Sequence, residues 1–222
     1  MSQDDYSIAQ LRANYEGTPL GASLEYALAQ DHTTRLAAVQ RAVDFACNQL
    51  EQHKHKKQGN DGCGLSEDEL TLEICEMLSM GGFQATHDED VGGHCDIVIR
   101  GKDLFLWLAE AKKHDSYDWL DKGFQQLSTR YSTGKNGQDN GEVLIYCYVR
   151  DAKAMLDKWR SELQERNPPV KTSTSHNGDQ LIFHSIHKHA STGLDFFVRH
   201  KAVALYWSPK DREPFKACST SA

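Results

Sequence analysis

Residues 94–112 read HCDIVIRGKDLFLWLAEAK, two apolar segments separated by a short polar turn at residues 101–103. This pattern predicts two strands, residues 94–100 and 104–112, that pair as a hairpin. The second segment is almost continuously apolar up to Ala109, which is typical of a central strand buried on both faces. The stretch therefore predicts the middle of a sheet.

The sequence around this hairpin predicts further helices and strands. Ser66 followed by Glu69 forms a capping box, which begins a helix that ends at Gly81-Gly82. Further helices are expected over residues 117–132 and 152–166. Further strands are expected over residues 83–91, 143–149, 181–186 and 194–206, and a polar loop over residues 171–180. This order predicts an α/β fold with a mixed central sheet flanked by helices.

The chain divides into three parts by composition. Residues 1–60 are expected to form a helical extension, with a helix from about Arg35 capped by Thr33-Thr34 and a basic linker from His53. The alternative for this charged run is a solvated hinge that binds nothing. Residues 61–209 are expected to form the α/β core and residues 210–222 a loose tail.

Length and charge exclude several classes of protein. The chain has 222 residues, 25 Lys and Arg against 32 Asp and Glu, and a formal net charge of −7. It cannot coat nucleic acid by bulk charge, and its apolar runs are too short to span a membrane. The acidic start is unlike a signal or transit peptide, and the six cysteines form no CxxC pair. We therefore expect a cytoplasmic protein with free thiols.

The hairpin carries three charged side chains at its polar end. Glu110 and Lys112 share one face of their strand, and the short turn brings Asp96 of the preceding strand close to them. Two carboxylates this close repel each other, so we expect a divalent cation, Mg²⁺ with Mn²⁺ as a substitute. The alternative is that Asp96 is a strand-edge charge and that Glu110 and Lys112 are a surface pair.

The order of elements over about residues 65–150 resembles that of the PD-(D/E)xK nuclease superfamily. It comprises a helix bearing Glu, a strand with Asp96, a strand ending in Glu110-Ala111-Lys112 and a following helix. Cys95 stands where that motif often has proline. The resemblance implies a restriction-endonuclease-like fold and a Mg²⁺-dependent nuclease acting on DNA in restriction, phage defence or repair, in which Asp96 and Glu110 hold the metal and Lys112 acts on the attacking water or the transition state.

Two further positions fit the superfamily pattern. Glu73, beside the apolar stripe of its helix, is expected to reach the metal, and Gln126 is expected to contact metal-bound water or phosphate. Some branches have Tyr four residues after this Gln, whereas here Tyr131 follows five residues later. The alternative for Glu73 is a solvated helix face.

Basic residues are candidates for contacts to nucleic acid. Lys113, Arg130 and Lys188 are the expected contacts, within local clusters that include residues 112–114, 187–189 and 199–201. The alternative is that these clusters are separate solvated surfaces.

The sequence is also compatible with three other interpretations. The same fold can serve as a non-catalytic module that binds nucleic acid or protein. The N-terminal helices can mediate a homodimer or a larger complex. The histidines at 184, 187, 189 and 200 can bind zinc, although no cysteine stands at finger spacing.

Overall fold

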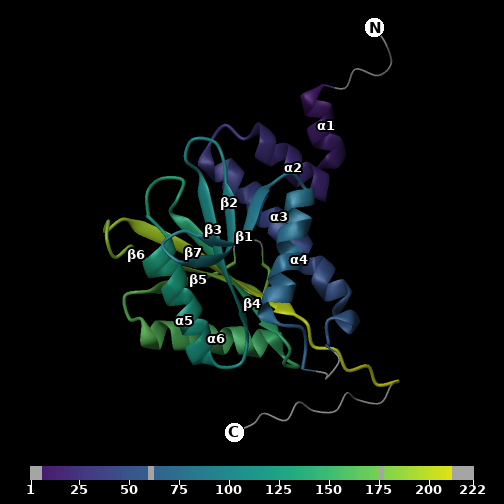
Figure 1. Ribbon diagram of the computed structural model, residues 1–222, viewed down its shortest axis with the longest axis vertical. Coiled ribbons are helices and arrows are strands. Elements are labelled where there is room, and N and C mark those ends of the chain that lie inside the picture. Colours follow the sequence, from purple (N-terminus) through teal and green to yellow (C-terminus); the bar gives the residue numbers. More distant parts are fainter. Residues whose placement is uncertain (1–6, 60–62, 176–177, 212–222) are drawn as a thin grey trace.

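The computed structural model describes residues 7–59, 63–175 and 178–211. A seven-stranded sheet with the order β1-β2-β3-β4-β7-β6-β5 forms its centre, and helices cover both faces (Figure 1). The helices are α1 (Ile8–Tyr15), α2 (Pro19–Leu28), α3 (His32–Gln52), a 3-10 turn (Lys54–Lys56), α4 (Glu67–Met80), α5 (Tyr117–Gln126) with the π turn Leu127–Tyr131, and α6 (Ala152–Arg166). The strands are β1 (Gln84–Asp90), β2 (His94–Arg100), β3 (Leu106–Lys113), β4 (Asn140–Cys147), β5 (Lys171–Thr174), β6 (Ile182–Lys188) and β7 (Asp195–Ala204). The predicted α/β class with a mixed sheet is confirmed.

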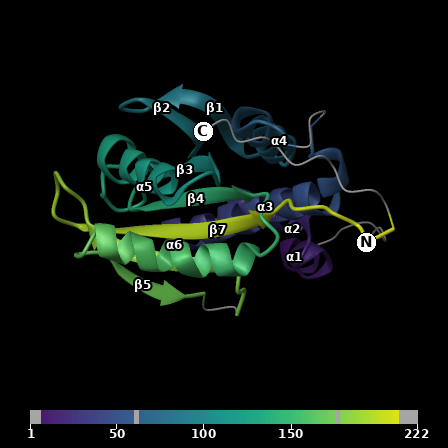
Figure 2. The same ribbon diagram turned by 90° about the horizontal axis from the view of Figure 1, so that it is seen from below.

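The sheet is antiparallel at both edges and parallel in the middle. β1, β2 and β3 form an antiparallel meander, and so do β7, β6 and β5. β4 pairs parallel to both β3 and β7, because α5 and α6 carry the chain back across the sheet. Seen from below, β1 and β2 lie at one edge and β5 at the other (Figure 2).

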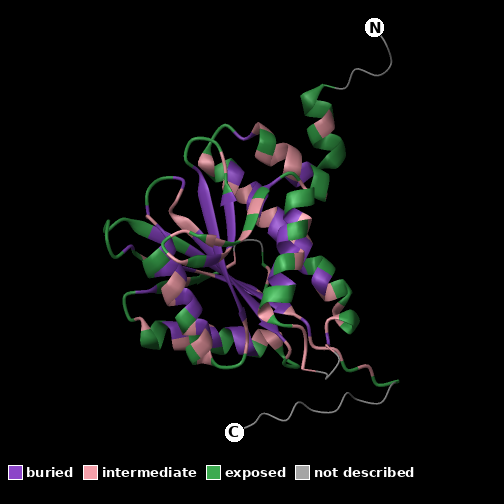
Figure 3. Cartoon of the chain, viewed as in Figure 1, coloured by how far each residue is buried: buried purple, intermediate pink, exposed green. Residues whose placement is uncertain are grey.

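The predicted hairpin of residues 94–112 forms from β2 and β3, with one correction at its turn. β2 has the predicted bounds, but β3 begins at Leu106, because Asp103 and Leu104 adopt positive φ angles of 59° and 62° and belong to the turn. The Leu104 side chain is 81% exposed as a result. From Leu106 on, β3 is buried almost throughout, which confirms its central place in the sheet (Figure 3).

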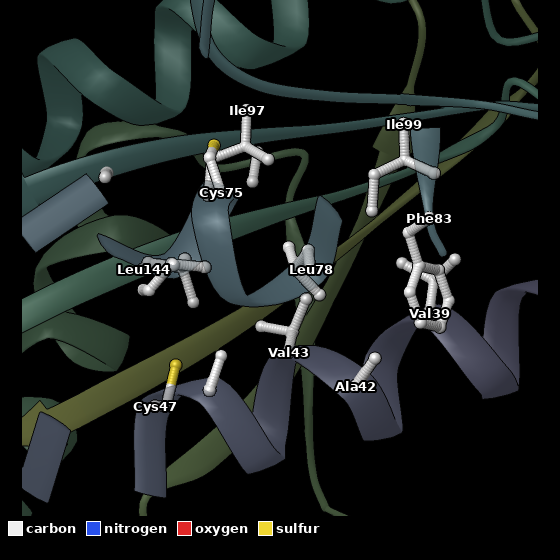
Figure 4. Close-up of a cluster of buried hydrophobic side chains, with 14 of the residues drawn as sticks. Val39, Ala42, Val43, Cys47, Cys75, Leu78, Phe83, Ile97, Ile99 and Leu144 are labelled. Carbon is white, nitrogen blue, oxygen red and sulfur yellow. The ribbon is translucent and has the colours of Figure 1, made fainter. Parts of the chain in front are cut away.

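Two apolar clusters lie on opposite faces of the sheet. One gathers α3 and α4 against β2, β3 and β4, with Val43, Leu78, Ile97 and Leu144 among its members (Figure 4). The other gathers α5 and α6 against the opposite face. Most of the buried residues of α3 belong to the first cluster, so this helix is part of the core.

The N-terminal helices form as predicted, with a different cap for α3. Asp31, rather than Thr33-Thr34, caps this helix by accepting a hydrogen bond from Thr34 N at 2.7 Å. α1 has no buried residue and lies at the periphery. The expected linker packs in its described part, where the 6% exposed Gln58 donates a hydrogen bond to Leu205 O at 2.9 Å.

Two other sequence expectations need correction. Residues 171–180 are not wholly loop, because Lys171–Thr174 pair with β6 as the edge strand β5. Cys47, Cys75, Cys95 and Cys147 are free and buried as expected, but Cys63 is disulfide-bonded. The tail expected from residue 210 lies outside the described residues from position 212. In the described part of the chain, no helix combines the length and hydropathy needed to cross a membrane.

Candidate active site

The β2–β3 hairpin brings Asp96 to the end of β3. The paired register of the two strands ends at Ile97 and Ala109, and Asp96 and Glu110 are the flanking residues just beyond that pair. At this point the Asp96 side chain bridges the two strands, since its Oδ2 accepts a hydrogen bond from the backbone N of Ala111 at 2.7 Å. This bond fixes the Asp96 carboxylate at the end of the hairpin.

The ammonium of Lys112 lies at the centre of three carboxylates. Its Nζ is 2.7 Å from Glu110 Oε1, 3.2 Å from Glu67 Oε1 and 3.7 Å from Asp96 Oδ2. The side chains of Lys112 and Glu110 are only 4% and 1% exposed. The predicted convergence of Asp96, Glu110 and Lys112 is therefore present, and a buried carboxylate without a cation beside it would be costly.

Glu67 is the residue that sequence reasoning missed. It is the first residue of α4, directly after the capping residue Ser66. Its Oε2 accepts hydrogen bonds from the backbone N of Lys113 at 2.7 Å and from Trp119 Nε1 at 3.2 Å. The capping box located the start of this helix, but the sequence does not show that this start meets the end of β3.

Glu73, the expected helix ligand, does not join this cluster. Its carboxylate pairs with the Lys57 ammonium. Glu69, the other acidic residue considered on this helix, bonds to Ser66 in the capping box. Glu67 and Glu73 are six positions apart, which turns Glu73 to a different side of α4.

Burial and mutual repulsion shift the pKa values of the acidic groups. The pKa of Glu110 is raised to about 7, first by burial and then by the nearby Asp96 carboxylate. Burial also raises the pKa of Asp96, although Lys112 opposes the shift. Burial favours the neutral amine of Lys112, but the surrounding carboxylates outweigh it and raise its pKa. In this arrangement Lys112 is a charged hydrogen-bond donor.

The donor set suits a hard divalent cation. Glu110 Oε2 is buried and has no hydrogen-bond partner among the described residues, so one carboxylate oxygen stays unsatisfied. Mg²⁺ is commonly bound through one or two carboxylates and keeps its other positions for water and phosphate, which Asp96 and Glu110 can provide. Within residues 7–59, 63–175 and 178–211, however, no three His, Cys, Asp or Glu side chains stand together as a ready metal site.

Helix α5 covers the cluster closely. A Cβ on Gly123 would lie 2.8 Å from Lys112 Cγ and 3.3 Å from Glu110 Cγ, so only glycine lets α5 pack this near to β3. Lys112 Nζ also lies 5.1 Å from the centre of the Trp119 ring. These contacts shield the ammonium from water and strengthen its electrostatic interactions.

The π turn after α5 brings Gln126 and Tyr131 together. Gln126 Nε2 donates to Tyr131 Oη at 3.2 Å, and that hydroxyl donates to the backbone O of His94 on β2 at 2.7 Å. In a π turn, residues five apart take the relation that residues four apart have in an α-helix. The expected helix over residues 117–132 therefore ends in a wider turn, which compensates for the five-residue spacing of this pair.

The three candidate nucleic-acid contacts differ in their surroundings. Lys113 Nζ donates to Cys63 O at 2.7 Å and Leu65 O at 3.1 Å, and Lys188 Nζ pairs with Asp195 Oδ1 at 2.7 Å. Arg130 is exposed at the end of the π turn.

The cluster at residues 199–201 is buried in the sheet. Arg199 bonds to Asp44 and Glu142, and His200 is fully buried, so the expectation of a basic surface there is wrong. The ring of His200 accepts from Trp159 Nε1 at 3.2 Å. His189 bonds to the backbone of Ser132 at 3.0 Å. The histidines thus form no zinc site among the described residues.

Comparisons with protein-family models, with curated proteins and with solved structures yield no match for this chain. The resemblance to the PD-(D/E)xK superfamily drawn from the sequence therefore stays a prediction.

Proposed function

We propose that the protein is a Mg²⁺-dependent nuclease that hydrolyses phosphodiester bonds, with DNA as the favoured substrate. The observation that carries the proposal is the meeting of the buried Lys112 and Glu110 with the half-buried Asp96 on the adjacent strand, where one oxygen of Glu110 has no hydrogen-bond partner among the described residues. A structural ion pair has no need of a second carboxylate or of an unsatisfied oxygen.

Asp96 and Glu110 would hold the cation, and Glu67 is the nearest further carboxylate. When bound there, Mg²⁺ supplies Lewis acidity toward a phosphoryl oxygen and lowers the pKa of a bound water, and Mn²⁺ is its usual substitute. The hydrogen bond from Ala111 N to Asp96 orients that carboxylate before any ligand arrives. Such preorganisation is what a metal site requires of its surroundings.

Lys112 would stabilise negative charge on the phosphoryl group. Its raised pKa keeps it protonated at neutral pH, so it acts as a donor and an electrostatic stabiliser. Trp119 and the close approach of Gly123 exclude water from one side of the ammonium. Gln126, through Tyr131, would hold β2 near its Asp96 end and so act as a positioning residue.

The test is cleavage of supercoiled plasmid by the purified chain in Mg²⁺, with EDTA as the blank. Wild-type protein should nick or linearise the plasmid, and Lys112→Ala and Asp96→Asn should each lose at least a hundredfold of the rate. Lys153→Ala, a lysine of α6 paired with Asp157, should cleave like wild type. Equal cleavage by all variants, or none by wild type in Mg²⁺ or Mn²⁺, would refute the proposal.

A second candidate function is a non-catalytic binding module on the same fold. The observation that favours it is that the Lys112 ammonium already pairs with all three carboxylates, and the raised pKa of Glu110, about 7, lets that carboxyl reduce the remaining charge by taking up a proton instead of a dication. Calorimetry separates the two functions. The nuclease should bind Mg²⁺ or Mn²⁺ in an Asp96-dependent way, whereas the module should not.

The proposed nuclease activity also suggests a cellular role and an oligomeric state. A cytoplasmic role in restriction, phage defence or repair fits a DNA nuclease, and cutting both strands of a duplex favours a homodimer. α1 and the start of α2 have apolar side chains available for this, since Ile8, Tyr15 and Leu20 are 57%, 38% and 49% exposed. Sedimentation of wild type against Ile8→Lys tests whether α1 mediates such a dimer.

A further inference from the structure

The carboxyl ends of three parallel strands lie at one edge of the sheet, and the carboxylate cluster occupies part of that edge. β4 pairs in parallel with both β3 and β7, so the residues that follow these three strands lie along the same edge. Lys112 and Lys113 end β3, Arg150 comes shortly after β4, and Tyr206 and Trp207 come after β7. In open α/β sheets, ligands bind outside the carboxyl ends of the strands.

The segment after α3 is folded onto the same edge. The hydroxyl of Tyr148, just beyond β4, donates a hydrogen bond to the backbone O of Lys57 at 2.8 Å. The centre of the same ring lies 5.0 Å from Lys113 Nζ at the end of β3. These contacts place the 3-10 turn Lys54–Lys56, which directly precedes Lys57, near the strand end that carries the carboxylate cluster.

This edge carries cations that have no carboxylate partner. Among residues 7–59, 63–175 and 178–211, Lys54, Lys56 and Arg150 form no ion pair. The acidic residues next to them in the sequence are Glu51 and Asp151, and each accepts a hydrogen bond from a backbone N–H, at the end of β7 and at the start of α6. In a chain with a net charge of −7, the edge is therefore a local surplus of positive charge.

Aromatic rings lie among these cations. The centre of the His55 ring lies 6.2 Å from that of Trp207, where the segment after α3 meets the chain that leaves β7 (Figure 1). The guanidinium carbon of Arg150 lies 5.9 Å from the centre of the Tyr206 ring. Both Tyr206 and Trp207 are partly exposed. Surfaces that bind single-stranded nucleic acid combine cations, which contact the phosphates, with aromatic side chains, on which bases stack.

We propose that a single strand of nucleic acid binds along this edge, on a surface formed by Lys54, His55, Lys56, Arg150, Tyr206 and Trp207. The three cations contact phosphates, and Trp207 stacks on a base. A double helix hides the faces of its bases, so it would engage the cations alone. Binding needs no metal, and only the continuation of the strand to Lys112, where it is cut, rests on the proposed nuclease function.

The first experiment measures the contribution of charge. It is fluorescence anisotropy of a labelled thymidine oligonucleotide of about 20 residues with the full chain in EDTA, at salt concentrations between about 50 and 200 mM. Three phosphate contacts predict a slope of log affinity against log salt of about −2. Lys54→Gln/Lys56→Gln should weaken binding roughly tenfold at the lowest salt and make the slope shallower by about 1.4.

The matched control is Lys102→Gln/Lys135→Gln. Both lysines are exposed and lie before the amino ends of β3 and β4, at the opposite edge of the sheet. This control changes the net charge by the same amount as the first pair and should bind the strand like wild type. Equal loss of affinity in the two double variants would show that net charge alone drives binding, and would overturn the proposal.

The second experiment measures the contribution of stacking. An abasic strand of the same length keeps the phosphates and lacks the bases. Wild type should bind the thymidine strand about fivefold tighter than the abasic strand, and Trp207→Leu should lose this preference while keeping the salt slope. Melting temperatures confirm that each variant is folded. A preference that survives in a folded Trp207→Leu, or a blunt duplex that binds tighter than the strand, overturns the proposal.

The partner and the nuclease are tested separately. A polyglutamate peptide of the same length should compete poorly, and competition as strong as that of the strand would indicate an acidic protein partner and overturn the proposal, as would absence of strand binding. Strand binding in EDTA without cleavage in Mg²⁺ refutes the nuclease and supports this surface. Where cleavage occurs, Lys54→Gln/Lys56→Gln should slow it at subsaturating strand, and an unchanged rate would show that the strand reaches Lys112 by another route.

Discussion

Gly123 of α5 lies directly against Lys112 of β3, and a Cβ at position 123 would stand 2.8 Å from Lys112 Cγ and 3.0 Å from its Cε. Helix α5, which covers the carboxylate cluster, therefore lies so close to β3 that only glycine fits at position 123. The position of the ammonium between its carboxylates depends on this packing.

Replacement of Gly123 by alanine should push Lys112 out of place. We expect Gly123→Ala to destabilise the protein by about 1–3 kcal/mol, as overpacking of a buried site does. Plasmid cleavage should fall together with stability, because the ammonium no longer meets Glu110. Urea unfolding and the cleavage assay measure the two effects, and a variant as stable and as active as wild type would contradict this packing.

Glu67 and Glu73 provide a matched pair on one helix. Glu67→Gln should weaken Mg²⁺ binding and cleavage by roughly 10–100-fold, the usual effect of losing a group that supports a metal site. Glu73→Gln should leave both unchanged, because its carboxylate pairs with Lys57. Calorimetric titration of both variants with Mg²⁺ measures the effect on binding. If Glu73→Gln weakened Mg²⁺ binding and Glu67→Gln did not, Glu73 rather than Glu67 would be the helix residue that supports the metal site.

Acid should destabilise the fold through His200. This ring is fully buried and accepts a hydrogen bond from Trp159 Nε1, and burial lowers its pKa well below the usual value. The contribution of the neutral ring to stability is complete above pH 6.5 and is lost as the pH falls. The reason is that the His200 ring then becomes protonated in the unfolded chain while it stays neutral in the native protein.

The neutral variant His200→Gln isolates this effect. It should be less stable than wild type at pH 7, yet its free energy of unfolding should fall less between pH 7 and pH 5. Urea titrations at the two pH values provide the comparison. Parallel slopes for wild type and variant would show that His200 does not carry the acid sensitivity.

Helices α3 and α1 should differ in their contribution to stability. Leu50 of α3 is 1% exposed within the first apolar cluster, so Leu50→Ala should cost about 2–5 kcal/mol. Ile8 of α1 is 57% exposed, and Ile8→Ala should change stability by less than about 0.5 kcal/mol. Thermal or urea unfolding tests both, and a mild effect of Leu50→Ala would mean that α3 is a separable arm.

The sequence predicts best where one local pattern decides the structure. The turn at residues 101–103 and the apolar run after it located the hairpin, and the hairpin brings the Asp96 carboxylate to Ala111 N, between Glu110 and Lys112 in the sequence. The predicted bounds of α6 agree because Pro168-Pro169 stops a strongly helical segment soon after its end. The capping box of α4 likewise depends only on residues three apart.

Contacts between residues far apart in the sequence explain where the sequence-based predictions were wrong. Glu67 reaches Lys112 across 45 positions of sequence, and no periodicity along α4 shows which end of the helix meets the sheet. Arg199 and Lys201 look like a surface patch, but Asp44 of α3 and Glu142 of β4 neutralise them in the interior. The edge strand β5 is short and polar, so its own residues carry no strand signal, and pairing with β6 defines it.

The central claim is that Asp96 and Glu110 together bind a divalent cation. The most direct measurement is a crystal soaked in Mn²⁺, with an anomalous difference map calculated at the manganese edge. We expect one strong peak within coordination distance of oxygens of both carboxylates, with the Lys112 ammonium displaced from between them. A map with no peak there, from crystals in which the Lys112 contacts stay unchanged at saturating Mn²⁺, would contradict it.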